Sequence, residues 1–132
     1  MKKHNITIVV PIYKPAMSDL EKVSFNQLIK VLGKHRIAVI KPESLDLSNL
    51  SASHPNLVME PFADEYFKGI PGYNKLMMSE EFYRRFEDSE YMLIYQLDAY
   101  VFRDELEMWC SKGYDYIGAP WLLKPMYKFP LF

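Results

Sequence analysis

The residues best suited to chemistry lie in an apolar run in the second half of the chain. Between Tyr91 and Phe102 the side chains are mostly aromatic or aliphatic, and one acidic residue, Asp98, interrupts them. A run that is apolar on both faces is typical of a strand buried in a parallel sheet. Because an unpaired buried carboxylate is strongly destabilising, we expect Asp98 at the open carboxyl end of this strand, near a cation, hydrogen-bond donors or a ligand.

Strand alternation predicts that two polar side chains point the same way. Gln96, Asp98 and Tyr100 would share one face of the strand. Ligands of open parallel sheets bind beyond the carboxyl ends of the strands, so this face could hold a metal-bound phosphate or a sugar hydroxyl. The alternative is structural: Asp98 would accept hydrogen bonds from backbone amides or pair with Arg103.

Further strands must flank this one to bury it. Segments 5–13 and 36–41 are rich in β-branched residues, and segment 114–119 also has a strand pattern. Segment 56–62 is predicted as a shorter strand, which Pro61 favours at an edge. A connection long enough for a crossover favours parallel pairing of the first two strands.

Helices are predicted between these strands. Ser18 and Glu21 form a capping box that begins the first helix, and Gly33 is placed to end it in a left-handed turn. Its expected apolar stripe consists of Leu20, Val23, Leu28, Val31 and Leu32. A second helical region begins at Pro71-Gly72 and breaks near Ser79 before a segment with Phe82, Tyr83 and Phe86. A last helix has Leu106, Trp109 and Cys110 facing inward and ends at Gly113.

These patterns predict an α/β fold, with a mainly parallel sheet of about four or five strands and flanking helices. The 132 residues suit one domain. The formal net charge of -1 gives no basic field for nucleic acid. A single cysteine, Cys110, agrees with a reducing compartment, and no apolar run is long enough for a transmembrane segment, so we expect a cytoplasmic protein. His4, His35 and His54 lack metal-ligand spacing and are expected to be solvated.

The order of the segments resembles the nucleotide half of a GT-A type glycosyltransferase. The motifs that carry the resemblance are VVPIY at 9–13, GYN at 72–74 and QLDAY at 96–100. The segments KPESLDLS, DEYFKGI, GYNKLM, YQLDAYVFRDEL and GYDYIGAPW are similar to an uncharacterised, glycosyltransferase-like family of bacterial polysaccharide-synthesis loci. This similarity spans nearly the whole chain but only the amino-terminal, donor-side half of that family.

The resemblance implies a nucleotide-binding role for five residues. It places Pro11 and Tyr13 beneath a nucleoside, Glu43 near the base or ribose, Asn74 by the nucleotide and Asp98 facing the diphosphate. Each of the first four also has a structural reading. Pro11 could only stop a strand, Tyr13 could fill the edge of the core, Glu43 could be solvated and Asn74 could cap a helix.

The resemblance also implies a divalent cation, Mg2+ or Mn2+, held by Asp98 against the diphosphate. The GT-A pattern usually has a second acidic residue two positions later, and here that position is Tyr100. The cation would therefore need water and phosphate ligands to complete its shell, or lysine and arginine side chains would replace it.

The expected activity is sugar-nucleotide-dependent glycosyl transfer in surface polysaccharide biosynthesis, in the cytoplasm or peripherally at the inner membrane. The partners would be a nucleoside diphosphate sugar and a glycan or lipid-linked acceptor. Because the acceptor half of the family has no counterpart, two alternatives stay open: a non-catalytic nucleotide-sugar-binding module and a truncated, self-associating subunit. An apolar tail over 121–132 predicts a homodimer.

Overall fold

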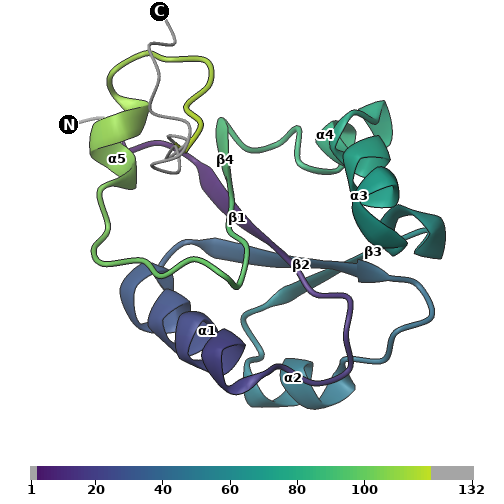
Figure 1. Ribbon diagram of the computed structural model, residues 1–132. Helices are drawn as coiled ribbons and strands as arrows, with labels where there is room; N and C mark the ends of the chain where they lie inside the picture. The colour runs from purple at the N-terminus through teal and green to yellow at the C-terminus, as the bar shows by residue number, and fades with distance from the viewer. Residues whose placement is uncertain (1–2, 120–132) are drawn as a thin grey trace, which may run out of the picture.

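The computed structural model describes residues 3–119 of the chain. Its strands are β1 (Ile6–Pro11), β2 (Arg36–Pro42), β3 (Val58–Phe62) and β4 (Tyr91–Ile94). They form one sheet in the order β3-β2-β1-β4, and every pairing is parallel (Figure 1). The α/β class and the parallel sheet are therefore confirmed, and the arrangement is Rossmann-like. The predicted edge position of β3 is confirmed within this sheet.

Helices cover both faces of the sheet (Figure 1). One face carries α1 (Asp19–Leu32) and α2 (Ser48–Ser53), and the other carries η1 (Asp64–Phe67), α3 (Gly69–Met77) and α4 (Glu80–Arg85). A short helix, α5 (Leu106–Cys110), lies near the amino ends of β1 and β4. Within the part of the chain described here, no helix has the length and apolar character needed to cross a membrane. The apolar tail predicted to form a homodimer lies outside the described residues.

Strand β1 is the centre of both hydrophobic clusters. Ile8 and Val10 pack into the cluster beneath α1, whereas Val9 packs into the cluster beneath α3 and α4. All three side chains are fully buried. Because successive strand residues point to opposite faces, a continuous apolar run is what a strand covered on both sides requires.

The start of α1 follows its local sequence signal. The Ser18 hydroxyl accepts a hydrogen bond from the Glu21 amide at 3.2 Å, and Glu21 Oε1 accepts one from the Ser18 amide at 3.0 Å. This confirms the predicted capping box. Ser79 likewise caps α4 by accepting a hydrogen bond from the Phe82 amide at 3.2 Å, which confirms the predicted break.

The predicted apolar stripe of α1 is wrong at its first two positions. Leu20 is 82% exposed and Val23 is 53% exposed. At about 100° per residue, both project roughly 140–160° away from Phe25, which is buried with Leu28. The left-handed turn expected at Gly33 is also wrong, because this residue keeps a right-handed conformation with φ of -63°.

The largest correction concerns the apolar run around Asp98. Strand β4 ends at Ile94 and lies at an edge of the described sheet, so the prediction of a central strand continuing to Phe102 is wrong. Its only described neighbour, β1, ends at Pro11, and the last bond between them joins the Tyr95 amide to the Val9 carbonyl at 2.9 Å. The next residue of β1 that faces β4 is Pro11, which has no N–H to donate, and the chain turns after Tyr95.

The predicted strand over 114–119 is also wrong, because those residues are exposed and have no regular structure. The helix before it forms over a shorter span, and Trp109 is 42% exposed rather than facing inward. Gly113 does follow that helix with a positive φ of 77°, a conformation that glycine adopts without strain.

Two histidines at the amino edge of the sheet bond to acidic residues in the segment around α5. His4 Nδ1 lies 2.8 Å from Glu107 Oε2, and His35 Nε2 lies 2.7 Å from Asp104 Oδ2. Both imidazoles are largely buried. The expectation that these histidines are solvated is therefore wrong. His54 is half-buried, with its ring packed edge-on against Phe25.

The Asp104 carboxylate is stabilised in its charged form. Burial opposes ionisation, but hydrogen bonds from His35 and from the Leu106 amide outweigh it and hold the pKa of Asp104 below its ordinary 3.8. A lowered pKa means that folding favours the carboxylate. Its contribution to stability is complete above the ordinary pKa and disappears as the pH falls through the lowered value.

Replacement of Asp104 by Asn tests the contact between Asp104 and His35. We expect Asp104→Asn to lower the free energy of unfolding by about 1–3 kcal/mol at pH 7, because a charged hydrogen-bond partner is lost. The difference from wild type should begin to narrow below about pH 4, where the Asp104 carboxylate of the unfolded chain becomes protonated, and should narrow further as the pH falls toward the lowered pKa of the folded state. Thermal unfolding followed by circular dichroism from pH 7 to pH 3 measures both, with exposed Asp115→Asn as the control. A difference that stays constant across this range would contradict the assignment.

Candidate functional site

The chain changes its direction of travel across the sheet at β1. It moves outward from β1 through β2 to β3, then returns to the other side of β1 to form β4. In open α/β sheets, the crevice beyond the carboxyl ends of the strands at such a reversal is the general place for a ligand. A cavity of about 490 Å³ lies at this position, lined by the residues that follow β1 and β4 and by α3.

The wall after β1 presents an exposed tyrosine. Pro11 ends the strand, and the Ile12 amide still bonds to the Ile40 carbonyl at 2.9 Å before the chain leaves the sheet. Tyr13 follows and is 58% exposed at the cavity. Lys14 lies beside it, with its ammonium nitrogen 2.9 Å from Glu21 Oε1 on α1. The end of β1 therefore brings an aromatic ring and an ion pair to the cavity.

The wall after β4 presents a carboxylate and an amide. The turn over 96–99 is closed by a bond from the Ala99 amide to the Gln96 carbonyl at 3.0 Å. Asp98 and Gln96 are exposed on this turn, whereas Tyr95 and Leu97 are buried. The predicted sharing of one side by Gln96 and Asp98 is therefore confirmed, although a turn rather than a strand produces it.

Neither structural explanation for Asp98 is found in the part of the chain that the structure describes. Arg103 pairs with Glu105 instead. Among residues 3–119, no hydrogen bond or ion pair is made by the Asp98 carboxylate. The carboxylate is thus exposed at the cavity and available to a ligand.

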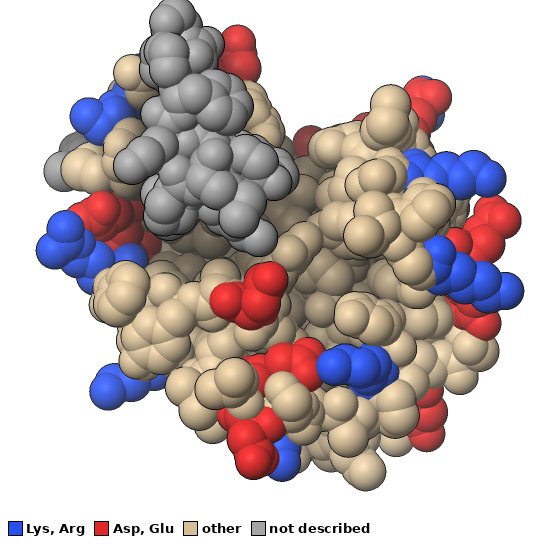
Figure 2. Space-filling model, viewed as in Figure 1, with Lys and Arg blue, Asp and Glu red and all other residues tan. Residues whose placement is uncertain are grey.

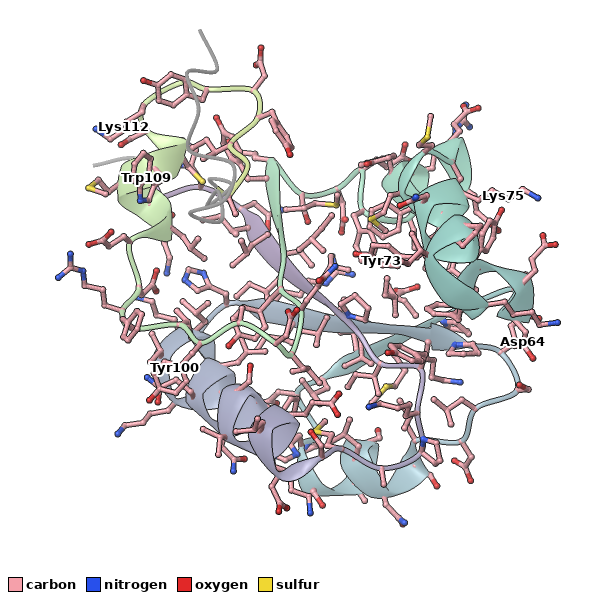
Figure 3. The ribbon with its side chains drawn as sticks, viewed as in Figure 1. Asp64, Tyr73, Lys75, Tyr100, Trp109 and Lys112 are labelled. Carbon is pink, nitrogen blue, oxygen red and sulfur yellow. The ribbon has the colours of Figure 1, made fainter. Side chains whose placement is uncertain are left out.

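Helix α3 supplies the third wall. Tyr73 lies three residues before the fully buried Leu76, so both occupy the same side of the helix. Figure 3 shows Tyr73 toward the sheet and Lys75 pointing away from it. The Tyr73 hydroxyl accepts a hydrogen bond from Gln96 Nε2 at 3.1 Å, which joins α3 to the turn after β4. Phe67 and Ile70 add apolar surface to this side of the cavity.

The formal charge of the cavity is negative, because one lysine and two carboxylates, Lys14, Glu21 and Asp98, are its charged lining residues. The hydrogen bond from Lys14 and the Ser18 amide hold the pKa of Glu21 below its ordinary value, and the same contact raises the pKa of Lys14. That ion pair leaves Asp98 as a negative group without a described partner. Figure 2 shows basic and acidic side chains interspersed over this face, with no large patch of one sign. A diphosphate bound here would therefore need an added cation.

The residues fit a shared cation site rather than a metal site built by the protein. Residues 3–119 contain no group of three or more His, Cys, Asp or Glu side chains that could hold a metal ion. Mg2+ commonly uses only one or two carboxylates when substrate phosphates and water supply its other ligands. Asp98 can serve as such a single carboxylate, whereas Tyr100 is not among the cavity-lining residues.

Three of the five predicted binding residues meet at the cavity: Pro11, Tyr13 and Asp98. Asn74 and Glu43 do not line it. Asn74 is exposed on α3 beside Tyr73, and Glu43 is exposed just after β2, with its amide bonded to the Phe62 carbonyl.

Sequence analysis did not assign binding roles to Tyr73 or Lys14, which both line the cavity. The helical spacing of Tyr73 with Leu76 was the available signal that this side chain faces the sheet. No comparable signal marked Lys14, because its position depends on the ion pair with Glu21.

Comparison with protein families matches residues 56–129 to a family described as "Protein of unknown function (DUF5672)". This span includes Tyr73, Gln96 and Asp98, and it begins after Pro11 and Tyr13. No curated protein and no solved structure matches the chain.

Gly72, next to Tyr73 on α3, lies close to the backbone of η1, and a substitution at Gly72 tests this contact. A Cβ atom at this position would lie 2.4 Å from the Glu65 carbonyl oxygen, so Gly72→Ala must push α3 away from η1. We expect a loss of about 1–3 kcal/mol in unfolding free energy, although alanine normally favours a helix. Urea unfolding measures this, and the exposed Lys75→Ala should stay within about 0.5 kcal/mol of wild type. A Gly72→Ala protein as stable as wild type would show that this contact does not fix α3.

Proposed function

The chain belongs to the DUF5672 family, whose function is unknown, and we propose that it binds a nucleoside diphosphate sugar in the cavity between β1, β4 and α3. The single observation that carries this proposal is that Tyr13 and Asp98, whose carboxylate has no partner among residues 3–119, lie together at the reversal point of a parallel sheet. A cavity of about 490 Å³ falls within the roughly 300–1,000 Å³ typical of small-molecule sites.

The aromatic side of the cavity suits the nucleoside. Tyr13 offers a ring face on which a base can stack, and Pro11 forms a rigid surface beneath it. The Gln96 amide and the Tyr73 hydroxyl already bond to each other and have remaining hydrogen-bonding capacity for ribose or sugar hydroxyls. Glu43, at the same carboxyl edge of the sheet, remains a proposed contact for the base or ribose, and Asn74 a proposed contact for the nucleotide.

The acidic side suits a diphosphate only together with a divalent cation. Asp98 would supply one carboxylate oxygen to Mg2+ or Mn2+, while phosphate and water oxygens supply the rest. When bound, such a cation neutralises charge on a leaving nucleoside diphosphate, which is the chemistry that glycosyl transfer requires. Asp98 itself would fix the position of the diphosphate end of the donor.

On this basis we propose that the protein acts as a sugar-nucleotide-dependent glycosyltransferase, or as its donor-binding part, in surface polysaccharide assembly. This step is supported by the GT-A-like order of VVPIY, GYN and QLDAY around the cavity. The acceptor would be a glycan or a lipid-linked sugar. The reaction would take place in the cytoplasm or at the inner face of the membrane.

A non-catalytic binding module is the second candidate, and the ion pair in the cavity favours it. Glu21 is engaged by Lys14, and Asp98 would be engaged by the diphosphate. Among the described residues that line the cavity, no carboxylate then remains to act as a general base. Such a protein would bind the donor without transferring its sugar.

Ligand-dependent stabilisation tests the site. We expect one of UDP, GDP, CMP or TDP, with Mn2+ present, to raise the melting temperature. A nucleotide at about 100 times its dissociation constant adds roughly 2.7 kcal/mol. At this nucleotide concentration the shift should require Mn2+ and be largely lost in Asp98→Asn, whose weakened affinity is measured at higher nucleotide concentrations, whereas the exposed Asp115→Asn should retain it. Absence of any nucleotide-dependent shift, or an unchanged shift in Asp98→Asn, would contradict the proposal.

Turnover separates the two candidates once binding is established. Release of nucleoside diphosphate from the matching sugar donor, above the rate without protein, supports the enzyme. Saturable binding with no release supports the module. The Asp98→Asn variant is the control for release, because it removes the proposed cation contact while keeping a side chain of similar size.

A further inference from the structure

We propose that the buried hydroxyl groups of Ser24 and Tyr95 are positioning groups that fix the turn carrying Asp98. That these hydroxyls restrain the turn follows from their contacts. That they also affect ligand affinity rests on the proposed function. Neither side chain touches the cavity. Both would act through the backbone carbonyl of Ala99.

The contacts form a small buried network. Ser24 Oγ and Tyr95 Oη lie 2.9 Å apart. The Ser24 hydroxyl is positioned to donate to the Ala99 carbonyl. Tyr95 Oη lies 3.1 Å from the Ala99 carbonyl oxygen and 3.3 Å from the Ser24 carbonyl oxygen, and its single hydrogen can be donated to one of them at a time. Ser24 is 3% exposed and Tyr95 is 5% exposed. A buried hydroxyl without a hydrogen bond destabilises the fold, because it has lost its bonds to water. We therefore expect Ser24 and Tyr95 to keep these contacts.

Few other backbone hydrogen bonds restrain the carboxyl end of the turn, whereas Gln96 and Leu97 hold its amino end through a bond to Tyr73 and through burial in the core. The last backbone bond to β1 is made by the Tyr95 amide, and the next bond along the chain closes the turn on itself, from Ala99 to Gln96. Asp98 therefore lies between two fixed points, the Tyr95 backbone and the Ala99 carbonyl. Without the bonds to the Ala99 carbonyl, we expect the carboxyl end of the turn, next to Asp98, to become more mobile.

The same network connects the two walls of the cavity. Ser24 lies on α1, one turn after Glu21, which pairs with Lys14 at the end of β1. Gln27 on the same helix donates to the Val101 carbonyl at 2.9 Å. Helix α1 thus holds both the loop after β1 and the segment after β4. The spacing between Tyr13 and Asp98 is set by this shared support.

Tyr95→Phe tests the positioning role while keeping the ring that fills the core. Tyr91→Phe is the matched control, because Tyr91 Oη also donates to a backbone carbonyl, that of Cys110 at 3.2 Å, but at the amino end of the same strand. Amide hydrogen exchange reports on the turn without any ligand. Exchange in residues 96–101 should rise about fivefold in Tyr95→Phe, the factor expected when one hydrogen bond is lost, and stay unchanged in Tyr91→Phe.

Binding gives the second readout. Affinity for the nucleotide and Mn2+ should fall about fivefold in Tyr95→Phe, with no comparable loss in Tyr91→Phe. In the Asp98→Asn background the further effect of Tyr95→Phe should be less than about twofold, because the two changes act through one contact. Ser24→Ala should reproduce the exchange result, since it removes the other donor to the Ala99 carbonyl.

The outcomes separate this inference from the proposed function. If wild type binds no nucleotide, the proposed function fails, and the exchange result alone decides whether Tyr95 and Ser24 hold the turn. Unchanged exchange at 96–101 in both Tyr95→Phe and Ser24→Ala would overturn the positioning role. Equal losses of affinity for Tyr95→Phe in the wild-type and Asp98→Asn backgrounds would overturn the claim that it acts through Asp98.

Discussion

The arrangement of the site depends on β1 lying between two parallel neighbours. Val9 pairs with Ala38 of β2 on one side and with Ile94 of β4 on the other. Both strands end at the same edge of the sheet. The chain after β1 leads into α1, and the chain after β4 runs beside α1 on its way to α5 (Figure 1). The space between these departing segments is the cavity, so the path of the chain that buries β1 also creates the site.

Side-chain hydrogen bonds take over where the ladder between β1 and β4 ends. After Tyr95 the chain is held to α1 by Ser24 and Gln27, and to α3 by the bond between Gln96 and Tyr73. Polar groups of the protein satisfy one another around the turn, yet the Asp98 carboxylate has no partner within residues 3–119. Because Asp98 is exposed, water satisfies its carboxylate in the free protein, and the carboxylate remains accessible from the cavity.

Sequence alone predicted the features that depend on neighbouring residues. The capping box of Ser18 and Glu21, the cap at Ser79 and the strands β1 and β2 are set by local hydrogen bonds and by β-branched runs. The resemblance to a GT-A nucleotide half grouped five residues, namely Pro11, Tyr13, Glu43, Asn74 and Asp98. Pro11, Tyr13 and Asp98 line the cavity, whereas Glu43 and Asn74 do not.

The rest depends on contacts between distant residues, which local patterns do not contain. The apolar run after Leu97 has a strand pattern, but the next β1 residue that faces it, Pro11, has no N–H for a ladder bond. The Ser24 hydroxyl bonds to the Ala99 carbonyl in the loop that forms instead. The pairing of His35 with Asp104 joins residues 69 positions apart. Leu20 and Val23 are apolar yet exposed, because Phe25 and Leu28 determine which side of α1 faces the sheet.

The most direct test of the donor site is paramagnetic broadening of amide signals by Mn2+ in the presence of a nucleoside diphosphate. Our account predicts that signals from 12–14 and 96–99 broaden first, that the effect needs the nucleotide, and that signals near His35 and Glu107 at the opposite edge stay sharp. Broadening centred elsewhere, or equal broadening with and without nucleotide, would contradict a diphosphate site at Asp98.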